Sequence, residues 1–268
     1  MANEDITHFT AVDHTADPTF FARFLHEANR NPTIIASKSI IIDGLHLKKA
    51  DRVLDVGCGM GADVFDLAAR VGAAGHVTGV DMSASLIEEA GRHAEAHTLP
   101  VSFEVGDVQA LRFEDDSFDA VRTERLLMHV PDAERAIAEM TRVLRPGGHM
   151  AVFDFDWETQ FCDSPYREVT RKITQSFCDG FKHGWIGRKL PRLFQQHGMA
   201  DVSVTYHTVV VDFDMLQLLL GGHVAHAVTA GSLSGDEADL WWTDLARASH
   251  EGTFLYGFTA FIVSGRKQ

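Results

Sequence analysis

The chain has 268 residues, of which 45% are hydrophobic and 23% are charged, so it can build a sizeable core and is not a disordered chain. Its 38 acidic residues outnumber its 24 basic residues, and the resulting net charge of −14 disfavours a nucleic-acid partner or an anionic membrane surface. The beginning of the chain has no signal-like segment, no apolar run reaches the roughly 18 residues of a membrane helix, and the three cysteines are too widely spaced for a disulfide framework or a zinc site. We therefore expect a cytoplasmic protein.

Residues 1–50 precede the first strand signal and carry apolar side chains at helical spacing. These are Phe20, Phe21, Phe24 and Leu25, and an apolar stretch follows over residues 37–47. This pattern predicts an N-terminal helical cap that covers one end of a sheet.

From residue 52 to about residue 155, short apolar runs alternate with amphipathic stretches, which is typical of βαβ units around a parallel sheet. The predicted strands are residues 52–56, 76–80, 101–105, 118–121 and 149–153. The clearest helix runs from about Asp132 to Leu144, because apolar residues recur there at helical spacing, Asp132 can cap its start, and Pro146-Gly147-Gly148 ends it.

After residue 155 the alternation of strands and helices changes. Residues 166–197 are predicted to be helical with a break near residues 184–187, and strands are predicted at 201–211 and 254–264. The intervening segment, 212–252, is too long for a hairpin turn and predicts a helical insertion, with a break at Gly221-Gly222. Together with residues 1–50 it is the candidate lid, and the two glycines are its candidate hinge.

A glycine-rich turn follows the first predicted strand, where Gly57, Gly59 and Gly61 alternate with other residues. Glycines let the main chain turn sharply and let a ligand approach its N–H groups. The same glycines also satisfy the dinucleotide-binding pattern, so they do not separate an S-adenosylmethionine (SAM) site from an NAD site.

Three acidic residues at the ends of consecutive strands narrow the choice of ligand. Asp55, at the mouth of the turn, would repel a pyrophosphate and favour a ligand with an ammonium and a sulfonium group. Asp81 ends the second strand, where a carboxylate can accept both hydroxyls of a ribose. Asp107 ends the third and can accept from an adenine amino group, while the N–H of Val108 donates to the ring. The charges favour SAM.

Five segments in order resemble the motifs of class I SAM-dependent methyltransferases. They are residues 55–61, 79–83, 106–108, 118–121 and 144–148. Within that class, the chain is most similar to the ubiquinone/menaquinone C-methyltransferase-like group of small-molecule enzymes. The resemblance covers about residues 52–155.

The resemblance implies an α/β, Rossmann-like, seven-stranded and mostly parallel sheet with an antiparallel last strand and helices on both faces. It implies one methyltransferase domain over residues 1–268, with a cap at 1–50, a SAM-binding core at 51–155 and acceptor-side elements at 156–268. It also places the methionine end of SAM at the glycine turn, the ribose at Asp81, the adenine at Asp107 and Val108, and Glu124 beside the cofactor. The expected cofactor-binding set is Asp55, Gly57, Cys58, Gly59, Asp81, Met82, Asp107, Val108 and Glu124.

The sulfonium of SAM is already activated, so methyl transfer needs alignment and exclusion of water more than a fixed catalytic motif. His129, Asp156 and His183 are weak candidates for a base, and a packing role is the stronger interpretation of His129. Arg188 is a candidate for binding an acceptor carboxylate or phosphate. His223 and His226 have metal-compatible spacing but no third ligand nearby, so no metal is expected.

We expect a small acceptor that is partly apolar or aromatic, because the segments around the expected methyl position supply large apolar side chains. These are Phe21, Phe24, Trp157, Phe161, Trp185 and Met215. Two other functions stay open, a SAM-binding protein without transferase activity and an NAD-dependent oxidoreductase, and Asp55 and Asp107 count against the second.

Overall fold

The computed structural model describes residues 5–7, 18–95 and 98–268, and it contains a seven-stranded sheet of order β3-β2-β1-β4-β5-β7-β6. The strands are β1 (Arg52–Val56), β2 (His76–Asp81), β3 (Val101–Val105), β4 (Phe118–Glu124), β5 (Leu144–Cys162), β6 (Met199–Val211) and β7 (Tyr256–Lys267). Strands β1 to β5 pair in parallel, and β7 is antiparallel to both β5 and β6. The predicted fold class is confirmed.

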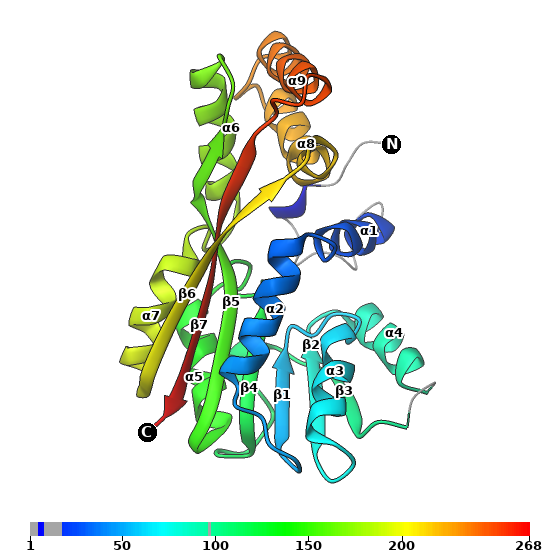
Figure 1. Ribbon diagram of the computed structural model, residues 1–268, viewed down its shortest axis with the longest axis vertical. Coiled ribbons are helices and arrows are strands. Elements are labelled where there is room, and N and C mark those ends of the chain that lie inside the picture. Colours follow the sequence, from blue (N-terminus) through cyan, green and yellow to red (C-terminus); the bar gives the residue numbers. More distant parts are fainter. Residues whose placement is uncertain (1–4, 8–17, 96–97) are drawn as a thin grey trace.

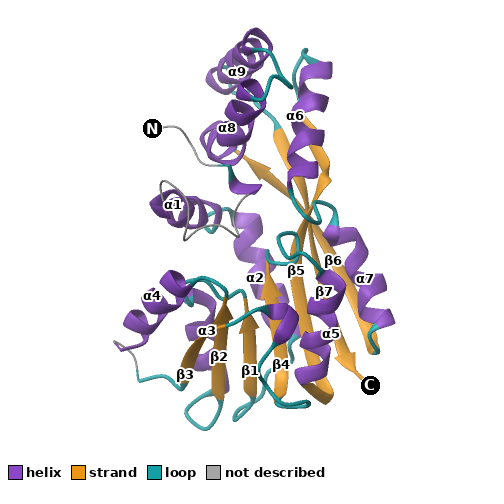
Figure 2. Cartoon of the chain, turned by 180° about the vertical axis from the view of Figure 1, so that it is seen from behind, coloured by secondary structure: helices purple, strands orange, loops and turns teal. Residues whose placement is uncertain are grey.

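Helices cover both faces of this sheet, as Figures 1 and 2 show from opposite sides. The helices of the βαβ core are α3 (Ala62–Val71), α4 (Ala84–Glu95) and α5 (Ala133–Val143). Two further helices, α6 (Arg167–Gly180) and α7 (Ile186–Gln196), follow β5. Asp132 caps α5 as predicted, because its side chain accepts a hydrogen bond from the N–H of Arg135 at 2.9 Å. The helix ends at Val143, just before the predicted Pro-Gly-Gly stop.

Strand β5 is much longer than the predicted residues 149–153. It begins directly after α5 and continues to Cys162, because it pairs with β7 as far as that residue. The register of the pairing shifts just before Phe161, which lies opposite Gly257. Aromatic side chains make this extension apolar: Trp157 is 1% exposed and its ring lies 4.4 Å from that of Phe258. Strands β5, β6 and β7 thereby reach up to the helices at the top of Figure 1.

The N-terminal cap and the insertion come together above the ends of the core strands. The cap consists of α1 (Pro18–Ala28) and α2 (Pro32–Gly44), and the insertion of α8 (Phe213–Thr229) and α9 (Gly235–His250). Helix α1 packs against α8, and α2 packs against β5, β6 and β7. Residues 1–4 and 8–17 of the predicted lid lie outside the described residues.

The predicted break at Gly221-Gly222 is wrong. Helix α8 runs through both glycines, and Leu220, Gly222 and His223 are buried. A glycine costs about 1 kcal/mol relative to alanine in a helix, and burial of the apolar side chains of α8 exceeds that cost. The two glycines therefore do not interrupt the helix. Across the described ranges, no helix is both long and apolar enough to cross a membrane.

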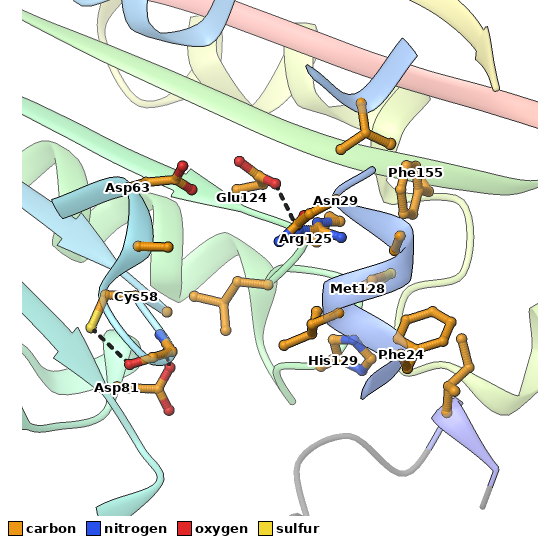
Figure 3. Close-up of a pocket in the computed structure, with 18 of the residues that line it drawn as sticks. Phe24, Asn29, Cys58, Asp63, Asp81, Glu124, Arg125, Met128, His129 and Phe155 are labelled. Atoms are coloured by element: carbon orange, nitrogen blue, oxygen red, sulfur yellow. Dashed lines mark hydrogen bonds and ion pairs between the residues drawn. The ribbon is translucent and has the colours of Figure 1, made fainter. Parts of the chain in front are cut away.

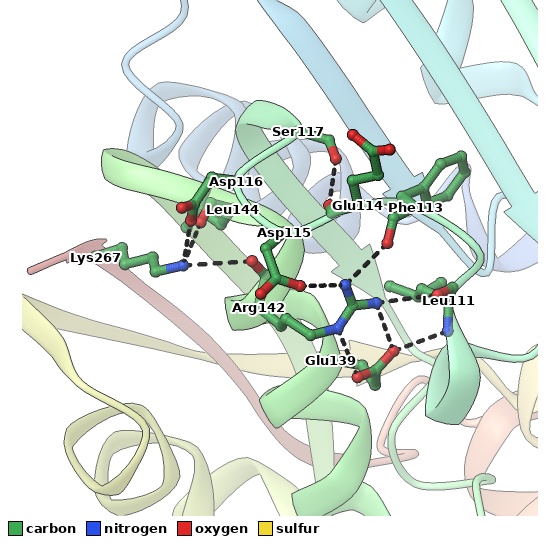
Figure 4. Close-up of polar contacts among 10 residues, drawn as sticks. All are labelled: Leu111, Phe113, Glu114, Asp115, Asp116, Ser117, Glu139, Arg142, Leu144 and Lys267. Atoms are coloured by element: carbon green, nitrogen blue, oxygen red, sulfur yellow. Dashed lines mark hydrogen bonds and ion pairs between the residues drawn. The ribbon is translucent and has the colours of Figure 1, made fainter.

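Figure 4 shows polar contacts that stabilise the end of the sheet opposite the carboxyl ends of the core strands. The guanidinium of Arg142 on α5 donates to the carbonyl groups of Leu111 and Phe113 and binds the carboxylates of Asp115 and Glu139 at 2.7–2.9 Å. A single charged group thereby holds the loop before β4 against α5, at the edge opposite the ends of the core strands where ligands bind in such sheets.

Candidate functional site

A cavity of about 710 Å³ lies over the carboxyl ends of β1, β2, β3 and β4. The residues of the predicted cofactor set all line it, from Asp55 to Glu124. The remaining wall comes from α1, α2 and the turn between them, from the segment after β4, from β5, β6 and β7, and from α8. Segments that are far apart in the sequence therefore share one cavity.

The glycine turn at the end of β1 leaves space for a ligand. The N–H groups of Gly57 and Cys58 donate to the carbonyl oxygen of Val80 at 2.7 and 3.1 Å, which ties the turn to β2. Gly59 has φ +53°, and a Cβ atom placed on it would have no atom within 4 Å. Since Gly59 lines the cavity, such an atom would enter the cavity, so the turn forms a cradle that only glycine leaves open.

The carboxylates of Asp81 and Asp107 are already oriented by main-chain amides. Asp81 accepts from the N–H of Gly59 and the N–H of Ser83, both at 2.9 Å. Asp107 accepts from the N–H of Gln109 at 2.8 Å and caps the short helix η2 (Val108–Ala110). Because each carboxylate oxygen has two lone pairs, both groups can hold the loops and still accept from a ligand.

Below the glycine turn lies a cluster of buried charges. Arg122 on β4 is 1% exposed, and its guanidinium lies 2.7 Å from Glu124, 3.2 Å from Asp63 and 3.6 Å from Asp55. Lys38 on α2 reaches the same cluster, 2.6 Å from Asp63 and 3.1 Å from Glu124. A buried charge is tolerated only when it is paired, and here the pairing joins the N-terminal cap to the cofactor edge.

Burial and pairing act differently on the carboxyls of this cluster. Burial raises the pKa of Asp55 to about 7, with only partial compensation from Arg122. Burial also acts on Asp63, but Arg122 and Lys38 hold its pKa down at about 2. The three carboxylates raise the pKa of the Arg122 guanidinium in turn, despite its burial.

The other half of the cavity is mostly apolar, as Figure 3 shows at Phe24, Met128 and Phe155. Of the six large side chains predicted there, Phe24, Trp157 and Met215 line the cavity. Phe21 is instead buried in the core. Phe161 and Trp185 do not line the cavity, and they are 39% and 42% exposed. Side chains that the sequence did not single out complete the wall: Ile6, Ile34, Phe155, Val209, Val211, Leu219 and Phe258.

Residues 47–198 match the family model of the methyltransferase domain. The chain belongs to this family. Family membership implies SAM as the methyl donor, in agreement with the order of the motifs around the glycine turn.

Relatives of the chain occur in several bacteria. The chain is 38% identical over 231 residues to an uncharacterized 37.1 kDa protein in transposon TN4556 of Streptomyces fradiae, covering 84% of this chain and 65% of that protein. It is 37% identical over 134 residues to the 2-phytyl-1,4-naphtoquinone methyltransferase of Synechococcus elongatus, covering 49% of this chain and 54% of that protein. The chain thus spans between about half and two thirds of the length of these relatives.

Solved structures share the fold at low sequence identity. The YcgJ protein of Bacillus subtilis has a TM-score of 0.62 at 20% identity, with 87% of this chain and 98% of that one covered. The geranyl diphosphate methyltransferase has a TM-score of 0.52 at 20% identity, with 87% and 78% covered. These likenesses show the fold of the methyltransferase domain.

The candidate bases of this methyltransferase domain differ in whether they line the cavity. His129 lines the cavity at 7% exposure, and burial lowers its pKa to about 3, so the imidazole is neutral. Asp156 lies outside the cavity wall and is fully buried against Arg188. His183 also lies outside the wall, where its ring donates to the carbonyl oxygen of Pro131 at 3.3 Å.

The remaining candidates serve other contacts. Arg188 is occupied by two carboxylates, Asp156 and Glu158, and does not line the cavity. His223 bonds to Ser176 at 2.8 Å and to Asp5 at 3.1 Å, so it joins α8 to α6 and to the N-terminal residues. Within the described ranges, no group of three or more potential metal ligands occurs.

The sequence interpretation missed the charged side chains that complete the cofactor edge, Lys38, Asp63 and Arg122, and it also missed Arg125, which lies between this edge and the apolar half. One signal was available. Arg122 directly follows the apolar pair Ala120-Val121 in the central strand Phe118–Glu124, and a charge at such a position requires buried partners. Its partners come from other elements, so the sequence alone did not name them.

Asp55 is expected to make cofactor binding depend on pH. Because burial raises its pKa to about 7, the carboxyl is neutral below that pH and negative above it. Only the negative form attracts the ammonium group of S-adenosylhomocysteine (SAH), so the affinity for SAH should rise from pH 6 to pH 8. Below the pKa of Asp55, the rise should reach up to about tenfold per pH unit. Calorimetric titration with SAH at each pH measures this rise, and Asp55→Asn should flatten it. A wild-type affinity that does not change over this range would contradict the assignment.

Proposed function

We propose that the protein transfers a methyl group from SAM to a small, largely apolar acceptor. The observation that carries the proposal is the single cavity in which the motif residues of the cofactor edge continue into an apolar chamber. Two of the similar proteins are named for the acceptors 2-phytyl-1,4-naphtoquinone and geranyl diphosphate, which is consistent with such a chamber.

The residues present fit the cofactor. The open space at Gly59 suits a ligand that lies against the main chain, and Asp55 suits its ammonium group. Asp81 would hold the ribose, and Asp107 with Val108 the adenine. Bound there, SAM supplies an electrophilic methyl group on its sulfonium, and the chain's own task is to bind, align and exclude water.

His129 is the one predicted base that lines the cavity, and it is neutral. The burial that keeps the imidazole neutral also disfavours its protonated form, so His129 is a weak base. We therefore propose that His129 shapes the apolar wall, and that methyl transfer depends on alignment with the sulfonium rather than on proton uptake by this ring. Its neighbour at 5.3 Å is the ring of Phe181, which keeps the surroundings apolar.

Calorimetry and a transfer assay test the proposal together. SAM and SAH should bind at micromolar order, about −8 kcal/mol, and NADH should not bind. With SAM labelled in the methyl group, incubation with a small-molecule extract should give a labelled product that partitions into organic solvent. NADH binding would favour the oxidoreductase, and SAH binding without a labelled product would favour a binding protein. We also propose a cytoplasmic location, which the three free cysteines support.

The predicted lid remains a proposal, now with contacts that support it. Phe24 of α1, Ile34 of α2 and Met215 of α8 all line the cavity. Access of SAM and acceptor requires these helices to open, and shielding of the sulfonium requires them to close. Amide hydrogen exchange in residues 18–50 and 212–252 should therefore be fast in the free protein and slow when SAH binds. Exchange that is slow from the start and unchanged by SAH would make them fixed parts of the fold.

A further inference from the structure

Charges are distributed unevenly along the cavity. Among the described residues, the acidic side chains of its wall all come from the cofactor edge, where Lys38 and Arg122 also lie, and they are Asp55, Asp63, Asp81, Asp107 and Glu124. The described basic side chains that line the remainder are His26, Arg30, Arg125 and His129. In the described part of the wall, an acceptor that enters the apolar half therefore meets no carboxylate beyond Glu124.

Arg125 is the cation placed where the two halves meet. Its main chain has φ +55° and its N–H donates to the carbonyl oxygen of Phe153 at 2.7 Å, so a left-handed turn follows β4 at this residue. Figure 3 shows it between Glu124 and the side chains of Met128 and His129. The side chain is 12% exposed. A cation in this position is largely removed from solvent.

The hydrogen-bonding capacity of Arg125 is only partly used. One terminal nitrogen, Nη2, lies 2.7 Å from Oδ1 of Asn29 and 2.8 Å from Glu124. Its Nε is buried and has no hydrogen-bond partner among the described residues. Glu124 also pairs with Arg122 and Lys38, so its single negative charge is divided among three cations. Because Arg125 lines the cavity, an oxyanion in the cavity would add a charge-assisted partner for a guanidinium whose one carboxylate is shared with two other cations.

We propose that the acceptor is an apolar molecule with an oxyanion group, such as a carboxylate, that binds Arg125. This inference rests on the proposed function and names the substrate class of that site. The apolar body would lie against Phe155, Trp157 and Met215, which line the same chamber. A cationic amine is excluded as the preferred acceptor, because it would meet Arg125 on one side and the sulfonium of SAM on the other.

We expect the carboxylate of SAM itself to bind a different cation, Lys38. Lys38 lies at the cofactor edge beside Asp63, the first-turn acid of α3. Arg125 is instead held toward the turn between α1 and α2 by Asn29. Loss of Arg125 should therefore change acceptor binding and leave SAH binding in place.

Three naphthalene derivatives of equal ring size test the charge preference without knowledge of the acceptor. They are 2-naphthoate, 2-naphthylmethanol and 2-naphthylmethylammonium, each titrated by fluorescence at pH 8 against protein saturated with SAH, which has no sulfonium. We expect the naphthoate to bind about tenfold more tightly than the alcohol, as a charge-assisted hydrogen bond provides, and the ammonium to bind most weakly. Equal affinities, or tighter binding of the ammonium, would overturn the proposal.

Arg125→Gln should weaken naphthoate binding about tenfold and change alcohol binding less than about twofold. The matched control is Arg30→Gln, since Arg30 also lines the cavity but is 70% exposed, and it should alter naphthoate binding less than about twofold. If Arg125→Gln leaves naphthoate binding unchanged, or abolishes SAH binding, the inference is wrong. Wild-type protein that fails to bind SAH would overturn the proposed function instead, so the two failures are distinct.

Discussion

Replacing Gly59 by valine is expected to abolish SAH binding while the protein still folds. Gly59 has φ +53°, where a non-glycine residue costs about 1–2 kcal/mol; it lines the cavity, and a Cβ on it would meet no protein atom within 4 Å. The branched side chain would therefore occupy the space of the ligand and disturb little else. Calorimetry should show no SAH binding at concentrations where the wild type saturates, and circular dichroism should show a retained cooperative unfolding transition.

Gly91→Ala provides the matched control for the valine variant. Gly91 lies on α4, has an ordinary φ, and a Cβ there meets no atom within 4 Å. This variant should bind SAH like the wild type. Valine at position 59 with near-normal SAH affinity would mean that the cofactor does not approach this turn.

Asp81→Ala is expected to weaken both SAM and SAH about 100-fold, or about 2.7 kcal/mol. The variant loses the acceptor for the ribose hydroxyls, and it also loses the two bonds from the N–H groups of Gly59 and Ser83 that shape the turns beside it. Each charge-assisted hydrogen bond contributes about 1.5–3 kcal/mol, so partial compensation by water still leaves an effect of this size.

Asp81→Asn separates the two causes of that loss. Its amide oxygen can keep one main-chain N–H as a partner but cannot accept from both hydroxyls of a ribose. Calorimetry should therefore place its SAH affinity between the wild type and Asp81→Ala. Equal affinity of the wild type and Asp81→Ala would remove Asp81 from the cofactor site.

The sequence predicted the parts of the fold that depend on local signals. The apolar strand runs, the cap at Asp132 and the glycine turn each depend on residues close in the chain, and the structure contains all three. The break at Gly221-Gly222 failed because tertiary burial of α8 overrides a weak local preference. The extension of β5 was missed because its pairing partner, β7, lies about 100 residues further along the chain.

The two halves of the candidate site also differ in how far the sequence predicted them. The cofactor edge follows strand ends that the motif order already identifies, so its residues were predicted together. The apolar half needs Ile6, Val209 and Phe258 in one wall, and no sequence spacing relates them. Arg125 acquires its orientation from a left-handed backbone and from Asn29, which neither propensity nor motif predicts.

Much of the apolar half of the cavity is bounded by segments near the two ends of the chain, which are separate in sequence from the motif segment that bounds the cofactor edge. Ile6, Phe24 and Ile34 lie before β1, and Val209, Met215 and Phe258 lie after α7. Substitutions in these flanking segments can alter acceptor choice during evolution without touching the glycine turn or its acids. For the same reason, chimeras that exchange residues 1–50 and 199–268 between members of the family are a rational route to new acceptors on an unchanged cofactor platform.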